Sequence, residues 1–205
     1  MVKNEIKKML TSKLYFAGSP EAVALRMRAK KMTHRFNQTI DLDVNQKNDL
    51  LRELLGRIGT NSYIEPPFRI DYGRYTTIGN HFYANYDCIF IDVAPITIGN
   101  DVFLGPRVSL YTAGHPIDAA IRNEELEYGK PITIGNSVWI GGNTVINPGV
   151  TIGSNVVIGS GSVVTKNVPD NVVAVGNPCH VLREITPEDH AYWQQQKDIY
   201  LHDND

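Results

Sequence analysis

One histidine stands where a regular six-residue repeat breaks off. The repeat ends in the segment LYTAGHP, where His115 follows Leu110 by five residues, and it resumes only at Ile132. A neutral imidazole, with an unperturbed pKa of about 6.5, is well matched to taking a proton from a hydroxyl group near neutral pH. The position at the break makes His115 a candidate general base, with an ordinary loop histidine as the alternative interpretation.

Three carboxylates follow His115 in the same insertion, at Glu124, Glu125 and Glu127. A catalytic base works better when a partner fixes its tautomer and orientation, so one of these carboxylates could orient the imidazole. Solvated loop charges are the alternative interpretation, and residue types alone leave the choice open. Asn85 in FYANYD is a further polar candidate, although asparagine at a corner is often only a turn former.

The elements that must position these residues form a long repeat. Aliphatic anchors recur every six positions, and the positions four residues further on are small or β-branched. A six-residue unit fits one short strand and a tight turn, and three units make one coil of a triangular solenoid. A β-sandwich is the alternative, but it requires a period-two alternation that the sequence lacks. The anchors are Ile134, Ile140, Ile146, Ile152, Ile158 and Val164, with Ile78, Ala84, Phe90, Ile98, Leu104 and Leu110 upstream.

The insertion preserves the phase of this repeat. Twenty-four residues separate the anchors Leu110 and Ile134, a multiple of six, so the chain can leave the solenoid and return in the same register. We therefore expect a solenoid over residues 61–185 and a loop extruded at about residues 114–131, with His115 at its root.

Helical segments are expected on both sides of the solenoid. Residues 1–60 are predicted to be helical, with Ser19 as an N-cap and a second helix in NQKNDLLRELLGRIG that ends at its glycines. Residues 186–205 are predicted to form a terminal helix. This helix could cap the open end of the solenoid, where unpaired strand edges would otherwise invite aggregation.

The composition excludes several classes of function. A net charge of −2 over 205 residues argues against nucleic acid or an anionic membrane as the main partner. The sequence lacks an apolar run of about 20 residues, and charges interrupt its first segment, so neither a membrane span nor a signal peptide is expected. Two cysteines cannot form a disulfide framework, which favours a reducing, cytoplasmic location.

Longer motifs carry a resemblance to a known family. KLYFAGSPE, EPPFRIDYG, FYANYD, GHP and GNPCHVLREI together resemble the maltose and galactoside O-acetyltransferases, a group of hexapeptide-repeat acyltransferases, across nearly the whole chain. The resemblance implies a mainly β fold, a left-handed parallel β-helix that assembles as a homotrimer with active sites between subunits. It also implies transfer of an acetyl group from acetyl-CoA to a sugar hydroxyl. We expect this transfer to be direct, in a ternary complex, because Cys88 falls on an inward position of the repeat and is not expected to act as a nucleophile.

The resemblance assigns roles to individual residues. His115 matches the catalytic base, and Glu127 occupies the position that would orient it. Asn85 would contact the acceptor and stabilise the oxyanion, as a hydrogen-bond donor does in other acyl transfers. Carboxylates suit sugars because they accept hydrogen bonds from two hydroxyls at once. The other expected acceptor contacts are Asp71, Tyr83 and Asp92.

Two positions depart from the galactoside pattern. Ala17 and Val93 stand where that subgroup has substrate-binding aspartates. The sequence is therefore closer to the maltose type, and we expect a glucosyl acceptor such as maltose or glucose. An alternative keeps the reaction and changes the acceptor to a xenobiotic or another hydroxyl compound.

Acetyl-CoA requires a groove for its pantetheine arm and cations for its phosphates. Glycine allows a ligand to approach the backbone closely. The position that often carries arginine in the family is His180, which makes that phosphate contact weaker or pH-dependent. The expected contacts are Trp139, Gly142, Ser160, Thr165, Lys166, His180 and Arg183.

Two other classes of function fit the solenoid less well. A zinc lyase would need three converging histidines, and His81, His115 and His180 lack that spacing, so no metal is expected. A non-catalytic scaffold would be free to lose His115 and Asn85, which this chain retains. Cys88 falls on an inward position of the repeat, which predicts a core residue rather than a nucleophile.

Overall fold

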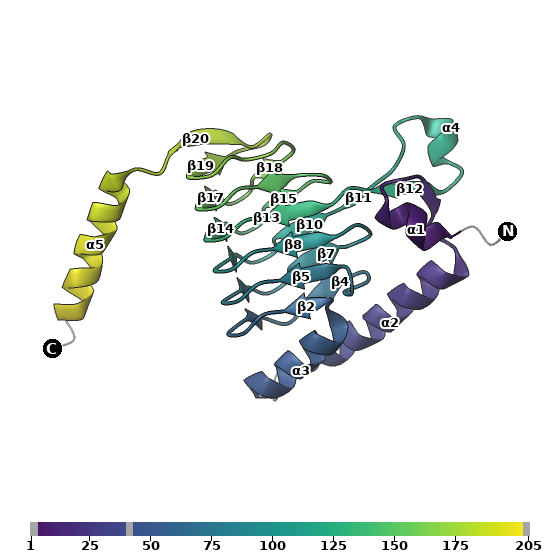
Figure 1. Ribbon diagram of the computed structural model, residues 1–205, viewed down its shortest axis with the longest axis horizontal. Coiled ribbons are helices and arrows are strands. Elements are labelled where there is room, and N and C mark those ends of the chain that lie inside the picture. The colour runs from purple at the N-terminus through teal and green to yellow at the C-terminus, as the bar shows by residue number, and fades with distance from the viewer. Residues whose placement is uncertain (1–3, 40–42, 203–205) are drawn as a thin grey trace.

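A three-sided parallel β-helix forms the body of the molecule (Figure 1). The computed structural model describes residues 4–39 and 43–202. Each coil adds one short strand to each of three sheets, and the strands pair in parallel with those of the coils above and below. The mainly β solenoid that the hexapeptide period predicts is therefore confirmed.

The three faces of the prism follow one another along the chain. The first face contains β2 (Arg57–Ile58), β5 (Thr76–Ile78), β8 (Ile96–Ile98), β13 (Ile132–Ile134) and β16 (Thr151–Ile152). The second face contains β3 (Tyr63–Ile64), β6 (Tyr83–Ala84), β9 (Phe103–Leu104), β14 (Val138–Ile140), β17 (Val156–Ile158), β19 (Val172–Val175) and β20 (His180–Glu184). The third face contains β4 (Arg69–Ile70), β7 (Ile89–Ile91), β10 (Ser109–Tyr111), β15 (Val145–Ile146) and β18 (Val163–Val164).

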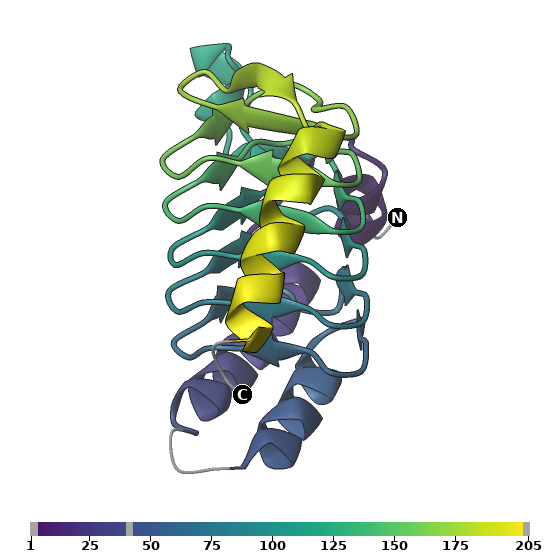
Figure 2. The same ribbon diagram turned by 90° about the vertical axis from the view of Figure 1, so that its left-hand side faces the viewer.

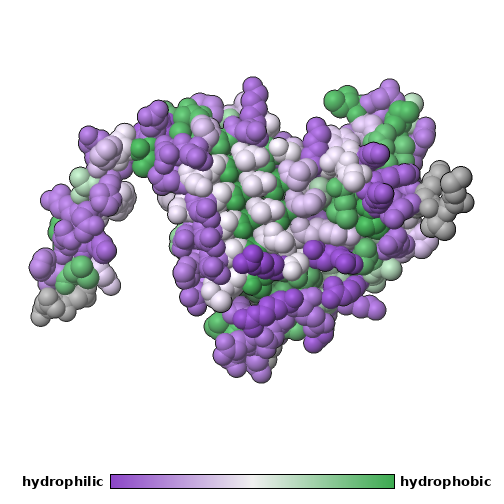
Figure 3. Space-filling model, viewed as in Figure 1, coloured by the Kyte–Doolittle hydropathy of each residue, from purple (hydrophilic) through white to green (hydrophobic). Residues whose placement is uncertain are grey.

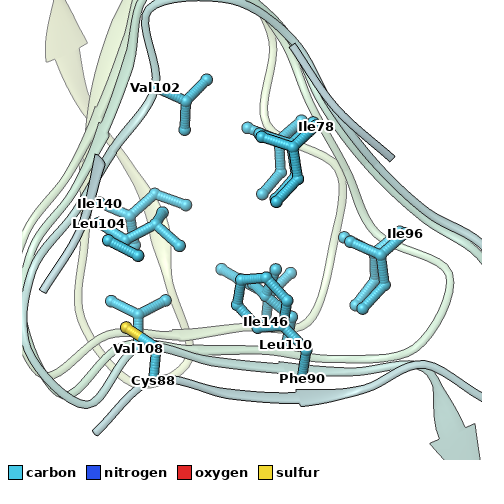
Figure 4. Close-up of a cluster of buried hydrophobic side chains, with 14 of the residues drawn as sticks. Ile78, Cys88, Phe90, Ile96, Val102, Leu104, Val108, Leu110, Ile140 and Ile146 are labelled. Carbon is cyan, nitrogen blue, oxygen red and sulfur yellow. The ribbon is translucent and has the colours of Figure 1, made fainter. Parts of the chain in front are cut away.

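The predicted anchors fill the interior of the prism. All of them are buried, and Figure 4 shows Ile78, Leu104 and Leu110 pointing inward from the three faces. Cys88 lies among them and is fully buried, as its place in the repeat predicts. Burying one aliphatic side chain contributes about 1.5–3 kcal/mol, so the stacked anchors supply the main favourable term for the fold.

The insertion leaves the register of the solenoid undisturbed. On the first face Ile98 pairs with Ile78 below it, and Ile134 pairs with Ile98 in the same way, although the insertion separates these two coils. The insertion itself is a hairpin of β11 (Ala113–Gly114) and β12 (Leu126–Gly129) with the short α4 (Ala119–Arg122) between them. The chain therefore leaves and re-enters the prism in phase, as expected.

A strand from the N-terminal segment completes this hairpin. β1 (Tyr15–Phe16) pairs antiparallel with β12, so that Tyr15 lies opposite Glu127. Tyr15 also packs with Met9 from α1 (Glu5–Leu10) in a small second core. The sequence predicts only helix in this segment, and the pairing ties the N-terminus to the root of the insertion.

Two helices close the N-terminal end of the prism. α2 (Pro20–Asn37) begins at Ser19, whose hydroxyl accepts from the Ala22 N–H, as predicted. α3 (Val44–Leu54) packs beside it below the first coil, and Phe36 and Leu51 join the core of the solenoid. The predicted second helix is too long at its C-terminal end. The Gly56 N–H donates to the Thr76 carbonyl, and β2 then begins the solenoid before residue 61.

The C-terminal helix stands away from the prism. α5 (Pro187–His202) has no buried residue within its described length, and Figures 1 and 2 show it running beside the coils without covering their open end. The space-filling view shows the same separation (Figure 3). The expectation that this helix caps the solenoid is therefore wrong, because β20 pairs antiparallel with β19 and covers that strand instead. Within the described ranges, no helix is long and apolar enough to span a membrane.

The stacking of anchors predicts a difference between inward and outward positions. Ile146 is fully buried between β10 and β18, so Ile146→Ala should lower the free energy of unfolding by about 2–5 kcal/mol. Thr133 is exposed on β13, and Thr133→Ala should change the stability by no more than about 0.5 kcal/mol. Urea unfolding followed by circular dichroism measures both, and equal effects would contradict the interior role of the anchors.

Candidate active site

His115 lies at the root of the extruded hairpin, directly after β11, with about half of its side chain exposed. Its Nδ1 atom is 3.3 Å from the Leu126 carbonyl oxygen. Because a carbonyl oxygen only accepts hydrogen bonds, this contact favours a proton on Nδ1 and leaves the Nε2 lone pair of the neutral ring free. Nε2 is therefore the atom that can take a proton from a bound hydroxyl.

Glu127 lies next to that nitrogen. Its Oε1 atom is 3.9 Å from Nε2 of His115, which is beyond ordinary hydrogen-bond range. Its Oε2 atom accepts a 2.7 Å hydrogen bond from the hydroxyl of Tyr15. The structure thus brings the predicted carboxylate to the predicted base. The contact that fixes the tautomer, however, comes from the Leu126 carbonyl and not from Glu127.

A cavity of about 420 Å³ opens beside His115, and we call it the His115 pocket. Arg26 reaches it from α2, and its guanidinium donates to the Tyr72 hydroxyl and the Ala17 carbonyl, each at 2.7 Å. The lining mixes cations and carboxylates with small residues, so it suits a polar ligand of modest size. Further lining residues are Phe16, Gly18, Arg122, Glu125 and Glu127.

Asp71 follows β4, at the edge of the third face that carries His115, and is partly buried. It lines a separate cavity of about 330 Å³ and not the His115 pocket. Burial raises the pKa of its carboxyl, the cations Arg26 and Lys30 act in the opposite direction, and the charge of Glu127 adds to the rise. These electrostatic partners put Asp71 on the same side of the prism as His115. Its expected role as an acceptor contact is therefore compatible with its position.

Asp92 has a structural role instead of the expected contact with the acceptor. Its side chain is fully buried, and its carboxylate accepts from the Tyr72 N–H at 2.7 Å and from the Thr76 hydroxyl at 3.0 Å. A ligand cannot reach it, so this expectation is wrong. Burial raises the pKa of Asp92 to about 7, with the two hydrogen bonds acting against the rise and nearby Asp71 adding to it.

A second cavity, of about 430 Å³, lies beside Asn85, and we call it the Asn85 pocket. The Asn85 side-chain oxygen accepts from the Tyr86 N–H at 2.8 Å, which leaves the amide NH₂ group as a donor. Tyr83 and Trp139 line the same cavity, so three residues that the sequence singled out are brought together. The remaining lining residues are Phe103, Leu104 and Gly105.

The two pockets share no residue and lie at opposite edges of the third face. Asn85 follows β6 and precedes β7, so it lies where the second face turns into the third. His115 follows β10 and β11, so it lies where the third face turns toward the first. One chain therefore holds two separate pockets, one beside each of the two predicted catalytic residues.

The predicted acetyl-CoA contacts divide between the same two edges. Gly142 and Ser160 follow β14 and β17, at the edge that carries Asn85, and Trp139 projects from β14 beside them. Thr165 and Lys166 follow β18, at the edge that carries His115, and both are exposed. A groove that uses all these residues needs two different edges of the prism.

The last two predicted contacts lie on β20. Arg183 donates to both carboxylate oxygens of Asp189, at 2.6 and 2.8 Å, so a phosphate would have to share this guanidinium. His180 is exposed, and its Nδ1 atom is 3.4 Å from the Pro178 carbonyl oxygen. Among the residues that the structure describes, no cluster of three His, Cys, Asp or Glu side chains could hold a metal ion.

Sequence reasoning missed Tyr15 and Arg26 as parts of the site. Both lie in the segment predicted to be helical, and Tyr15 belongs to a two-residue strand whose partner is 112 residues away. A strand this short has no periodicity of its own. The tyrosine in KLYF could be connected to Glu127 only through the folded structure.

Two stretches of the chain match described families. Residues 8–59 match the maltose acetyltransferase hexapeptide capping motif, and residues 131–166 match the bacterial transferase hexapeptide, with six repeats. The first stretch covers the helices that close the prism, and the second covers coils of the prism itself.

Relatives and solved structures extend this likeness to nearly the whole chain. The galactoside O-acetyltransferase of Escherichia coli is 45% identical over 181 residues, which cover 88% of each chain. A maltose O-acetyltransferase structure from Clostridium difficile 630 is 49% identical, with a TM-score of 0.87, over 91% of this chain and 100% of that one. A galactoside acetyltransferase in complex with coenzyme A is 41% identical, with a TM-score of 0.89, over 92% and 94%.

The buried carboxyl group of Asp92 predicts a pH-dependent stability. Its folded pKa of about 7 lies above the usual value, so its protonated form stabilises the fold at low pH, and this contribution is lost as pH rises through 7. Asp92→Asn should remove this pH-dependent loss of stability. Between the pKa of Asp92 in the unfolded chain and its pKa in the folded protein, the loss approaches about 1.4 kcal/mol per pH unit. Melting temperatures of both proteins from about pH 4.5 to about pH 8 measure it. A difference that stays constant with pH would contradict this account.

Proposed function

The chain belongs to the maltose and galactoside O-acetyltransferase family, and on that premise we propose a specific reaction for it. It transfers the acetyl group of acetyl-CoA to a hydroxyl of a glucosyl sugar such as maltose or glucose. The acetyl-CoA-dependent O-acetyltransferase activity follows from the family, whose solved members include a complex with coenzyme A. The acceptor and the roles of individual residues are the proposal.

His115 is the general base in the proposed reaction. Its Nε2 atom takes the proton of the acceptor hydroxyl while that oxygen attacks the thioester carbonyl carbon of acetyl-CoA. The amide of Asn85 donates a hydrogen bond to the oxyanion that forms. The carbon–sulfur bond then breaks, and the thiolate takes the proton from the imidazolium, which yields an acetyl ester and free coenzyme A.

This reaction needs no acyl-enzyme. Cys88 is fully buried, and burial raises the pKa of its thiol to about 11, so it is a poor nucleophile at neutral pH. The acetyl group passes directly between the two bound substrates. Holding both in one site supplies the entropic advantage that a covalent intermediate would otherwise provide.

The separation of the His115 pocket from the Asn85 pocket is the main observation that supports the proposed assembly. His115 and Asn85 lie at opposite edges of the third face, and the predicted acetyl-CoA contacts divide in the same way. A homotrimer of prisms brings the His115 edge of one chain to the Asn85 edge of the next. Three complete sites then form between subunits.

A glucosyl acceptor fits the lining of the His115 pocket. Glu127 borders the cavity, and Asp71 lies at the same edge of the prism, where the charge of Glu127 acts on it, so two carboxylates can accept hydrogen bonds from sugar hydroxyls. Ala17 and Val93 remove the two aspartates of the galactoside pattern, and Val93 is buried in the small second core. This combination supports the maltose type over the galactoside type.

Replacement of the proposed base tests the role of His115. His115→Ala should lower kcat by at least a hundredfold, since a positioned base contributes about 10²- to 10⁴-fold. Release of free thiol from acetyl-CoA with maltose or glucose measures the rate, and the melting temperature should stay unchanged as a control. A near-normal rate in the folded variant would rule out His115 as the base.

Mixed oligomers test whether the site lies between two chains. His115→Ala and Asn85→Ala should each be nearly inactive alone, because each loses one half-site. Co-expression, followed by purification through tags on both chains, should restore activity at about a third of the interfaces, because every mixed trimer contains one interface with both intact residues. Failure of mixed, correctly assembled oligomers to regain activity would contradict a shared site.

A further inference from the structure

We propose that Tyr15 is a positioning residue that holds Glu127 ready to bind a second hydroxyl of the acceptor, next to the hydroxyl that reacts. The inference rests on the proposed function, because it takes His115 as the base. It adds a requirement that the family assignment does not contain. The acceptor must carry two neighbouring hydroxyls, and a strand from the N-terminal segment enforces this choice.

Tyr15 is held rigidly where it meets Glu127. Only 1% of its surface is exposed, and its ring packs against Met9, Tyr72 and Val93 in the small second core. The antiparallel pairing of β1 with β12 puts Tyr15 directly opposite Glu127. Its hydroxyl donates to Oε2 of that carboxylate at 2.7 Å.

The neighbouring backbone of β1 is also fixed. The Phe16 N–H donates to the Glu5 carboxylate at 2.8 Å, which ties the strand to α1. A rigid hydrogen-bond donor loses little conformational freedom when its partner binds a ligand, so it can set the direction of the Glu127 carboxylate before the acceptor arrives.

The bond to Tyr15 leaves the other carboxylate oxygen for the acceptor. Oε1 of Glu127 lies 3.9 Å from Nε2 of His115, too far for a direct hydrogen bond. The two atoms therefore do not satisfy each other, and both border the His115 pocket. Two adjacent sugar hydroxyls can use them together: the reacting hydroxyl donates to Nε2, and its neighbour donates to Oε1.

The charges around Glu127 support these separate roles for its two carboxylate oxygens. Burial, followed by the hydrogen bond to Glu127, raises the pKa of Tyr15, so the phenol stays protonated and donates. Arg26 is already bound to the Tyr72 hydroxyl and the Ala17 carbonyl. Among the described residues, 4–39 and 43–202, the Tyr15 hydroxyl is therefore the group that donates a hydrogen bond to the Glu127 carboxylate.

A series of deoxy sugars measures the requirement for a second hydroxyl. The probes are methyl glucoside and its four monodeoxy derivatives, with acetyl-CoA, and NMR identifies the acetylated position. The wild type should lose at least tenfold in kcat/KM when the hydroxyl beside the reacting one is absent, because Oε1 is then left unpaired. Tyr15→Phe should reduce this preference about fivefold.

A double-mutant cycle tests whether Tyr15 acts through Glu127. Glu127→Ala should abolish the preference for the second hydroxyl, and adding Tyr15→Phe to it should change the preference no further. Tyr75→Phe is the matched control, since it removes another phenol that packs against the same small core, and the charges that act on it are those of Arg74, Asp92 and Glu21 instead of Glu127. The control should leave the ratio of kcat/KM between the parent sugar and the deoxy sugars unchanged.

Three results would overturn the proposal. The wild type could acetylate parent and deoxy sugars equally, Tyr15→Phe could lower every rate by the same factor, or the two substitutions could act additively on the ratio. Each of these leaves acetyl transfer by His115 intact. Failure of the wild type to acetylate any sugar would instead remove the proposed function together with this inference, so the two failures are distinguishable.

Discussion

Every coil of this protein must return to the same phase, because its strands pair in parallel with the coils above and below. A shift of one residue would turn the inward anchors outward and unpair the backbone along a whole face. The stacked pairs Ile78, Ile98 and Ile134 on the first face show that the rule holds even across the insertion. This constraint explains why the interior consists of stacked apolar side chains in register, and why the insertion leaves the prism at an edge.

The edges are therefore where function can develop. The insertion emerges at one edge and carries His115 and Glu127, while the opposite edge of the same face presents Asn85 and Trp139. A rigid prism cannot bend to bring its own edges together. The same rigidity that secures the fold thus keeps the two pockets of one chain apart, so a site that uses both of them, as we propose, needs two prisms to meet.

The sequence predicts the repetitive part of this structure well and the long-range part poorly. The anchors, the phase of the insertion and the burial of Cys88 follow from a period that each coil repeats. Asp92 is expected to contact the acceptor because a carboxylate can accept hydrogen bonds from two sugar hydroxyls. Its carboxylate turns inward instead, where the Tyr72 N–H and the Thr76 hydroxyl donate to it.

Two other features depended on contacts that local patterns do not encode. The pairing of Tyr15 with Glu127 joins residues 112 positions apart through a two-residue strand. The open end of the solenoid suggested a cap formed by α5, but β20 covers the neighbouring strand β19, and the helix stands apart. Contacts that form only in the folded chain decided both outcomes.

The central claim is that the reaction takes place where the His115 edge of one chain meets the Asn85 edge of another. A crystal structure of the oligomer with coenzyme A bound tests this most directly. The thiol sulfur should lie between His115 of one chain and Asn85 of its neighbour. A thiol held by both edges of a single chain, or located away from His115, would contradict it.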